Sequence, residues 1–251
     1  MHVDTVDRPA EPLLCVAPPR NVLCLGKNYY AHASEFARFS SDSEVVPDVP
    51  IVFTKAASSL CGPTDDIVVD PELAAALDYE VELGVVIGLG GTRISEERAE
   101  EHVLGYTVVN DTTARDLQQQ HKQWFLGKSL PRATPVGPVV VPRDALPDLP
   151  RRGIRCWVNG ELRQQALLGD MIFDVTGAIA AISRITPLET GDVIAMGTPS
   201  GVAVGFTPPR YLQDGDRVVC EIDGIGRLDN TVRVRRADAR PDRVCSRTKE
   251  G

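Results

Sequence analysis

The chain has 251 residues, which by usual domain sizes indicates one large domain. Apolar residues make up 43% and charged residues 25%, values typical of a globular protein, so the composition excludes a fibrous or largely disordered chain. The formal net charge is −8 and no dense basic block occurs, which argues against nucleic acid or an anionic membrane as a partner.

The beginning of the sequence is polar, and no apolar run approaches the roughly 20 residues that span a bilayer. We therefore expect a cytoplasmic protein. The six cysteines include no Cys-x-x-Cys pair; they are Cys15, Cys24, Cys61, Cys156, Cys220 and Cys245. We expect buried or inert thiols rather than disulfides or a cysteine metal site.

In chain order, short runs rich in β-branched and aromatic residues predict strands. These runs cover residues 22–25, 51–54, 81–87, 106–109, 136–141, 154–158, 193–196 and 218–222. Two segments, 95–103 and 174–183, carry the starting residues or the apolar spacing typical of helices. Because 21 glycines and 19 prolines join many short strands, we expect a β-rich α+β fold, a sandwich or rolled sheet with a few peripheral helices.

Two segments have the composition of loops. Residues 36–50 are polar and Ser-rich and end with Pro47 and Pro50, which suits a lid that orders over a site. A passive surface connection is the alternative. Residues 236–251 are mostly polar and charged, and we expect a flexible, solvated tail there.

The strongest local signal is the acidic strand that follows Asp78. Side chains alternate along a strand, so Glu80 and Glu82 point to one face while Val81 and Leu83 point to the other. On a buried strand two adjacent carboxylates repel each other unless a cation or a shared proton compensates them. Mg²⁺ or Mn²⁺ suits such oxygen ligands. The alternative is the polar, solvent-facing side of an edge strand.

A second acidic cluster follows the predicted strand at 106–109. Such strand ends commonly carry ligands, so Asp111 or Asp116 could supply a third carboxylate. Arg115 could neutralise charge or bind an anionic substrate with its planar guanidinium. The alternative for Asp111 is a helix N-cap.

Histidine is scarce, which narrows the search for a general base to two candidates. His2 lies at the chain start and His102 near the end of a predicted surface helix, leaving His32 and His121. On a helical turn His32 and Glu35 share one face, and the carboxylate would raise the basicity of the ring as water activation requires. A solvated surface pair is the alternative.

Six motifs follow one another along the chain. They are Gly26-Lys27-Asn28-Tyr29 before His32 and Glu35, Asp78-Tyr79-Glu80-Val81-Glu82-Leu83, Asn110-Asp111-Thr112-Thr113-Ala114-Arg115-Asp116, Gln123-Trp124-Phe125-Leu126-Gly127-Lys128-Ser129, Val158-Asn159-Gly160, and the run 191–202. Together they resemble the fumarylacetoacetate hydrolase family over about residues 21–234.

The resemblance implies the family's β-rich roll, usually a homodimer, with bound Mg²⁺ or Mn²⁺. Residues 21–235 would form the catalytic domain, after an N-terminal arm at 1–20. The matched positions are Glu80, Glu82 and Asp111 for the metal, His32 and Glu35 for the water-activating dyad, Lys128 near the reacting carbon, and Arg115, Gln118, Thr198 and, more weakly, Lys55 on the substrate side. The stretch 129–134 departs from many relatives, which leaves the substrate open.

The activity implied by the resemblance is metal-dependent hydrolysis of a carbon–carbon bond in an acylpyruvate or related 2,4-dioxo acid. His32 would activate the attacking water and Lys128 would stabilise the enolate product. The same enolate chemistry without water attack would give an oxaloacetate-type or 5-oxopent-3-ene-1,2,5-tricarboxylate-type decarboxylase or isomerase. A non-catalytic metal-binding homologue is a further alternative.

Overall fold

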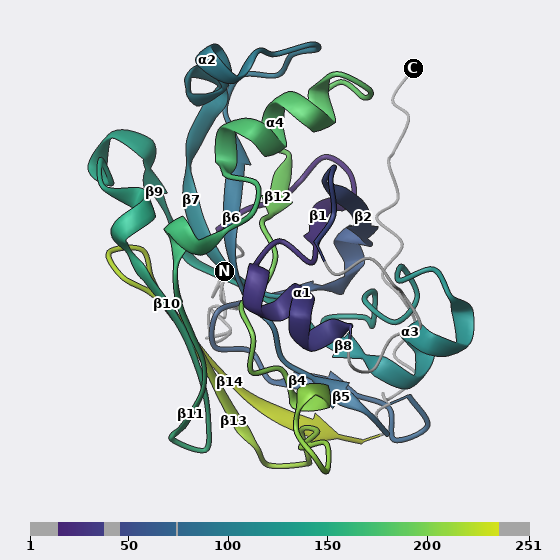
Figure 1. Ribbon diagram of the computed structural model, residues 1–251. Coiled ribbons are helices and arrows are strands. Elements are labelled where there is room, and N and C mark those ends of the chain that lie inside the picture. Colours follow the sequence, from purple (N-terminus) through teal and green to yellow (C-terminus); the bar gives the residue numbers. More distant parts are fainter. Residues whose placement is uncertain (1–14, 38–45, 74, 236–251) are drawn as a thin grey trace, which may run out of the picture.

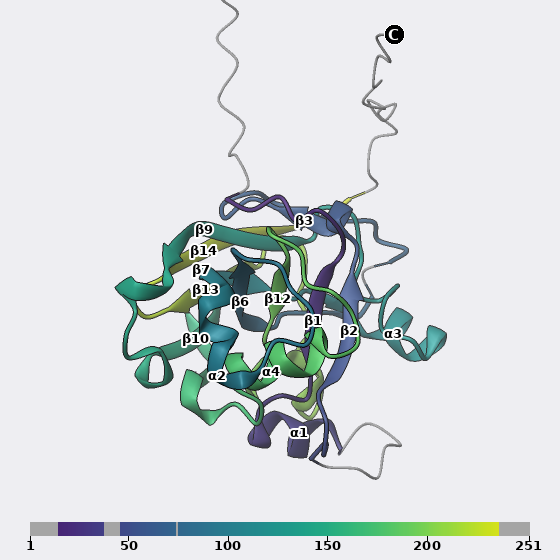
Figure 2. The ribbon, with the colours of Figure 1, turned by 90° about the horizontal axis from the view of Figure 1, so that it is seen from above.

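The structure is a computed structural model that describes residues 15–37, 46–73 and 75–235. Most of the predicted arm, the centre of the predicted lid and the whole predicted tail lie outside the described residues. Figures 1 and 2 show two packed sheets with short helices around them.

The described residues form four α-helices and fourteen strands, with short 3₁₀ helices between them. The strands are β1 Val22–Gly26, β2 Ile51–Lys55, β3 Leu60–Cys61, β4 Ile67–Val69, β5 Leu77–Asp78, β6 Val81–Ile87, β7 Val103–Asn110, β8 Thr113–Ala114, β9 Thr134–Pro142, β10 Gly153–Val158, β11 Glu161–Leu167, β12 Val193–Ala195, β13 Arg217–Ile222 and β14 Gly226–Val234. The helices are α1 Tyr30–Phe36, α2 Glu96–Ala99, α3 Arg115–His121 and α4 Val175–Ser183. A 3₁₀ turn important below is η6, Ala203–Gly205.

Two mixed sheets make up the body. The seven-stranded sheet has the order β2-β1-β12-β6-β7-β9-β3, the five-stranded sheet the order β11-β10-β13-β14-β4, and β5 pairs with β8 separately. The pairs β1–β12, β3–β9 and β4–β14 are parallel and the others antiparallel. The large sheets pack face to face through β6, β7 and β9 against β10, β13 and β14. The predicted β-rich, rolled α+β architecture is confirmed.

The core explains why β6 is the central strand. Val81 and Leu83 face the five-stranded sheet in the main core, whereas Val86, on the other face, packs with Val109 in a second apolar cluster. Both faces of β6 are covered and its neighbours β12 and β7 cover both edges. The edge-strand alternative for Glu80 and Glu82 is therefore wrong, and the prediction of a buried acidic strand is confirmed.

The helices lie at the periphery, as predicted. The predicted helix at 95–103 is one α-turn, α2, which continues as a 3₁₀ turn from Glu100 to His102. The helix predicted at 174–183 is α4, whose N-cap Asp174 accepts a hydrogen bond from the Gly177 N–H at 2.8 Å. These two helices pack together at the top of Figure 1. Every helix in the described ranges is too short or too polar to cross a bilayer.

Two predictions about single side chains need comment. His102 was predicted on a helix surface but is buried. Its Nδ1 lies 2.6 Å from the Leu89 carbonyl oxygen, so the ring turns towards the protein instead of the solvent. The five cysteines in the described ranges are free, and all except Cys15 are buried, as expected. Cys245 lies outside those ranges.

Candidate active site

Three carboxylates meet where β6 begins and β7 ends. The two strands are antiparallel and Val81 pairs with Asn110, so Glu80, one residue before β6, lies beside Asp111, one residue after β7. The Asp111 N–H donates to the Glu80 carbonyl at 2.8 Å. Glu82 lies on the same side as Glu80, and a ligand oxygen from each of the three residues lies within 4.8 Å of the others. Asp116, the other candidate, is outside this described cluster.

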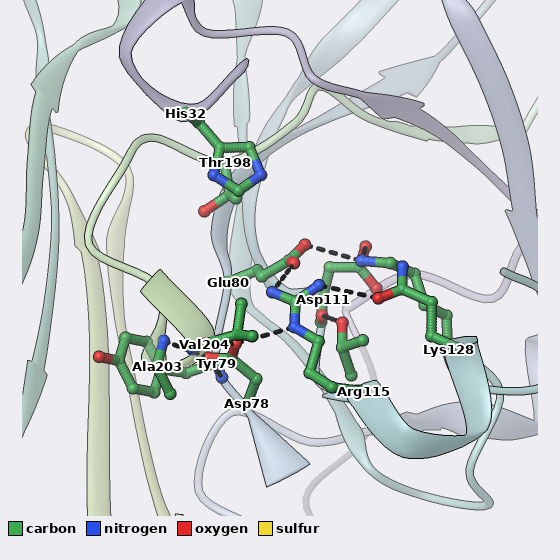
Figure 3. Close-up of polar contacts among 12 residues, drawn as sticks. His32, Asp78, Tyr79, Glu80, Asp111, Arg115, Lys128, Thr198, Ala203 and Val204 are labelled. Carbon is green, nitrogen blue, oxygen red and sulfur yellow. Dashed lines mark hydrogen bonds and ion pairs between the residues drawn. The ribbon is translucent and has the colours of Figure 1, made fainter. Parts of the chain in front are cut away.

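Three cationic side chains surround these carboxylates (Figure 3). Lys128 Nζ donates to Glu80 Oε2 at 2.7 Å and to Asp111 Oδ2 at 2.5 Å. Arg115 Nη2 donates to Glu80 Oε1 at 2.6 Å. Lys55 Nζ lies 2.6 Å from Asp111 Oδ1. The sequence analysis named all three cations, and the fold brings them to the acidic cluster from β2, α3 and the loop before β9.

The charges are unevenly balanced. Burial raises the pKa of Glu80, but Lys128 and Arg115 outweigh burial and bring this pKa below its ordinary value. Glu82 has no salt bridge to the described residues and accepts the Gly197 N–H at 2.9 Å. Burial, followed by the charges of Asp111 and Glu80, raises its pKa well above the ordinary value. Without a further cation, the site disfavours the charged form of Glu82.

The donor set fits a hard divalent cation. Asp111 Oδ1 is buried and receives no hydrogen bond of adequate geometry within the described residues, although Lys55 is close. A Mg²⁺ or Mn²⁺ ion would compensate Glu82 and give Asp111 Oδ1 a further partner, since both ions bind carboxylate oxygens and retain open positions for water or substrate.

The predicted histidine–glutamate pair lies in α1. His32 Nδ1 is 3.2 Å from Glu35 Oε2, and His32 is 5% exposed. The Gly201 N–H lies 3.1 and 3.2 Å from the two Glu35 oxygens. The alternative of a solvated surface pair is therefore wrong, because the 198–206 loop covers the pair. Figure 3 draws His32 and Thr198 above Glu80, and all three residues line one cavity.

One small cavity connects these groups, with about 310 Å³ of empty space including its open mouth. Most predicted site residues line it, namely His32, Glu80, Glu82, Arg115, Gln118, Lys128 and Thr198. The other three predicted residues lie behind this lining. Glu35 contacts His32 and Asp111 contacts Lys128, both of which line the cavity, and Lys55 contacts Asp111.

Sequence reasoning assigned no role to several lining residues. These are Leu25, Gly26, Lys27, Phe36, Phe53 and Trp124. Trp124 packs edge-on against Phe53, with ring centroids 5.1 Å apart, and a Cβ on Gly26 would lie 2.2 Å from the Trp124 ring. Gly26 and Trp124 both belong to motifs that the sequence analysis identified. Their contact could not be predicted, because it joins segments far apart in the sequence.

The chain is similar to several known proteins. A family model described as fumarylacetoacetate (FAA) hydrolase C-terminal matches residues 21–233. The chain is 48% identical over 215 residues to oxaloacetate tautomerase YisK of Bacillus subtilis (strain 168), covering 86% of this chain and 70% of that protein.

Two solved structures extend the comparison. A fumarylacetoacetate hydrolase from the psychrophile Exiguobacterium antarcticum superposes with a TM-score of 0.79 at 47% identity, covering 87% of this chain and 76% of that chain. Fumarylpyruvate hydrolase from Pseudomonas aeruginosa, in complex with Mn²⁺ and pyruvate, superposes with a TM-score of 0.76 at 32% identity, covering 91% and 99%.

Proposed function

Since the chain belongs to the fumarylacetoacetate hydrolase family, we propose that it is a divalent-metal-dependent enzyme that interconverts the keto and enol forms of oxaloacetate or a closely related small 2-oxo dicarboxylic acid. The observation that carries the proposal is that a histidine–carboxylate pair and two carboxylates of the acidic cluster line one small cavity with Lys128 and Arg115. The similarity to a tautomerase favours this reaction over carbon–carbon hydrolysis, which stays a prediction.

Glu80, Glu82 and Asp111 would hold Mg²⁺ or Mn²⁺. The bound metal would act as a Lewis acid that polarises the 2-oxo group of the substrate. Arg115 and Lys128 place two permanent positive charges at the same end of the cavity, where they would attract the substrate carboxylate. Gln118 and Thr198 line that cavity and offer neutral hydrogen-bonding groups to it. A 2-oxo acid therefore finds complementary charge here.

His32 would transfer the proton between carbon and oxygen. If Nδ1–H donates to Glu35, Nε2 carries the lone pair and acts as the base. Glu35 would favour the protonated ring that forms when the substrate loses its proton. Lys128 would stabilise the negative charge of the resulting enolate, because its pKa is raised by Asp111 and Glu80 against the opposing effect of burial.

Carbon–carbon hydrolysis of an acylpyruvate is the second candidate. The buried His32–Glu35 pair has the arrangement needed to activate water, and a fumarylpyruvate hydrolase shares the fold at 32% identity. Decarboxylation of oxaloacetate would use the same enolate chemistry. Under either activity we expect a cytoplasmic homodimer.

The two candidates are separated by assaying one preparation with Mg²⁺ or Mn²⁺ against three substrates. Ultraviolet absorbance follows the approach of oxaloacetate to keto–enol equilibrium and, separately, the cleavage of acetylpyruvate and fumarylpyruvate. We expect the protein to accelerate the keto–enol equilibration of oxaloacetate, and chelation to abolish this acceleration. Cleavage of both acylpyruvates should be slower than the equilibration. Efficient cleavage without accelerated equilibration would instead establish the hydrolase, and inactivity towards all three would contradict both proposals.

A further inference from the structure

One buried carboxylate beside the site belongs neither to the acidic cluster nor to the proton-transferring pair. Asp78, at the end of β5, is 0% exposed and accepts four hydrogen bonds (Figure 3). Its Oδ1 accepts the N–H groups of Tyr79 at 2.8 Å and Ala203 at 2.7 Å. Its Oδ2 accepts the Val204 N–H at 3.1 Å and Arg115 Nε at 2.8 Å.

The contacts of Asp78 with Ala203 and Val204 lead to Glu35. Ala203 and Val204 belong to the same tight loop as Gly201, whose N–H contacts the Glu35 carboxylate. The Tyr79 hydroxyl donates to the Gly201 carbonyl at 3.0 Å, so the residue after Asp78 holds the next peptide group of the same glycine. Asp78 and Tyr79 together therefore fix the backbone donor that orients Glu35.

The contact of Asp78 with Arg115 leads to the acidic cluster. All three guanidinium nitrogens of Arg115 are engaged, because Nε donates to Asp78, Nη2 to Glu80 and Nη1 to Gln118 Oε1 at 3.1 Å. A planar guanidinium held at three points has one orientation. Without Asp78, Arg115 would keep its attraction to Glu80 but would lose the contact that fixes the plane.

We propose that Asp78 is a positioning residue whose single carboxylate sets the Glu35 loop and Arg115 relative to one another. The site requires a carboxylate there because all four neighbours are donors. The amide group of asparagine would turn its own N–H donors toward one pair of them, whichever way it is oriented. The kinetic part of the test rests on the proposed function, whereas its binding and exchange measurements do not.

The first test is a pair of double-mutant cycles on the Mn²⁺-loaded protein with oxaloacetate. We expect Asp78→Asn to lower kcat by about 10- to 100-fold and to raise KM by roughly 10-fold, typical of a lost charged hydrogen bond. When Glu35→Gln is already present, adding Asp78→Asn should lower kcat further by less than about threefold. When Arg115→Lys is already present, adding Asp78→Asn should raise KM further by less than about threefold. Fully additive losses in both backgrounds would overturn the proposal.

A milder variant isolates the loop. Tyr79→Phe removes the hydroxyl that donates to the Gly201 carbonyl and leaves the contacts of the Asp78 carboxylate and of Arg115 in place. We expect lower kcat with unchanged KM, and no further loss of kcat when Glu35→Gln is added. If Asp78→Asn does not fold, this variant still tests whether the hold on Gly201 orients Glu35.

The matched control is Asp192→Asn. Asp192 is also fully buried and accepts from Arg20 Nε at 2.9 Å and the Glu189 N–H at 2.8 Å, but it contacts no residue of the site cavity among the described residues. Its substitution should lower the melting temperature and leave kcat and KM within about twofold. An equal kinetic loss here would show that any buried charge defect disturbs the site.

Two measurements need no turnover. Calorimetric titration of the Mn²⁺-loaded protein with oxalate should show about tenfold weaker binding in Asp78→Asn, with no change in Tyr79→Phe or Asp192→Asn. Amide exchange at Gly201 should accelerate in Asp78→Asn and Tyr79→Phe only. If wild-type protein does not act on oxaloacetate, the proposed function fails, yet these two results still decide the role of Asp78. Unchanged oxalate affinity and exchange would reject it.

Discussion

Glu82 differs from the other carboxylates of the cluster in its charge environment. Glu80 and Asp111 each contact two cationic side chains, whereas Glu82 has the Gly197 N–H. Burial and the two neighbouring carboxylates raise its pKa, so this carboxyl group binds a proton more readily than an exposed glutamate does. A metal ion binds the charged carboxylate and therefore competes with that proton.

We therefore predict that, at pH values below the raised pKa of Glu82, Mn²⁺ binding releases a proton and strengthens as the pH rises. The raised pKa also means that the folded, metal-free protein binds more protons than the unfolded chain. Its free energy of unfolding should accordingly fall as the pH rises from the ordinary glutamate pKa towards the raised value. Calorimetry in two buffers of different ionisation enthalpy measures the released protons. Glu82→Gln should abolish the release, and the same proton count in that variant would contradict the assignment.

His32 should affect proton transfer without affecting the metal. His32→Ala is expected to lower the rate of keto–enol exchange by about 10² to 10⁴, the usual effect of removing a positioned base. Mn²⁺ affinity should barely change, because the carboxylate cluster does not include His32. Any metal-assisted decarboxylation, which needs no attacking water, should survive better. The control is His121→Ala, an exposed histidine at the end of α3. Intact exchange in His32→Ala would remove this residue from the mechanism.

At the scale of elements, the proton-transferring pair lies in α1, and a loop rather than a strand contacts its glutamate. The 198–206 loop turns at Gly201, whose φ of +102° is a conformation that favours glycine. Gly205 has no such φ, but a Cβ there would lie 2.2 Å from Glu35 Oε1. Glycine at 205 is therefore explained by the space that Glu35 occupies.

Gly205→Ala should displace the Glu35 carboxylate and leave the fold intact. We expect kcat to fall by roughly 10-fold or more, with the melting temperature lowered by only a few degrees. The control is Gly177→Ala in α4, where the nearest atom is Asp174 Oδ1 at 3.3 Å and where alanine favours the helix. Wild-type kcat in Gly205→Ala would show that Glu35 moves without consequence.

The sequence predicted elements well where burial follows a simple period. All eight predicted strands are present, with β7 starting earlier and β9 longer than expected. The long strand β14 was missed because Asn230 occupies a buried position between Leu228 and Val232. Its amide donates to the carbonyls of Gly62 and Asp65, at 3.2 and 2.8 Å, contacts that no local pattern reveals. A buried polar residue therefore concealed the alternation.

At the scale of the molecule, the site is assembled from segments far apart in the sequence. The carboxylates could be predicted because strand alternation and the motifs place them, and their clustering is confirmed. The role of Asp78 could not, since its partner loop lies 125 residues away and its contacts are to backbone N–H groups, which have no sequence signature. Residue types reveal charge, but the direction of a donor depends on the fold.

Because the carboxylates join β6 to the end of β7, metal should stabilise the whole domain. Mn²⁺ at about 100 times its dissociation constant adds roughly 2.7 kcal/mol to the free energy of unfolding, and for a domain of this size that raises the melting temperature by roughly 5 to 11 °C. Glu82→Gln should lose most of this shift while the metal-free variant is at least as stable as the metal-free wild type, since burial and the neighbouring carboxylates disfavour the charged wild-type carboxyl. Asp192→Asn should start from a lower melting temperature and keep the full shift. Thermal unfolding with Mn²⁺ and with chelator measures each case, and an undiminished shift in Glu82→Gln would place the metal elsewhere.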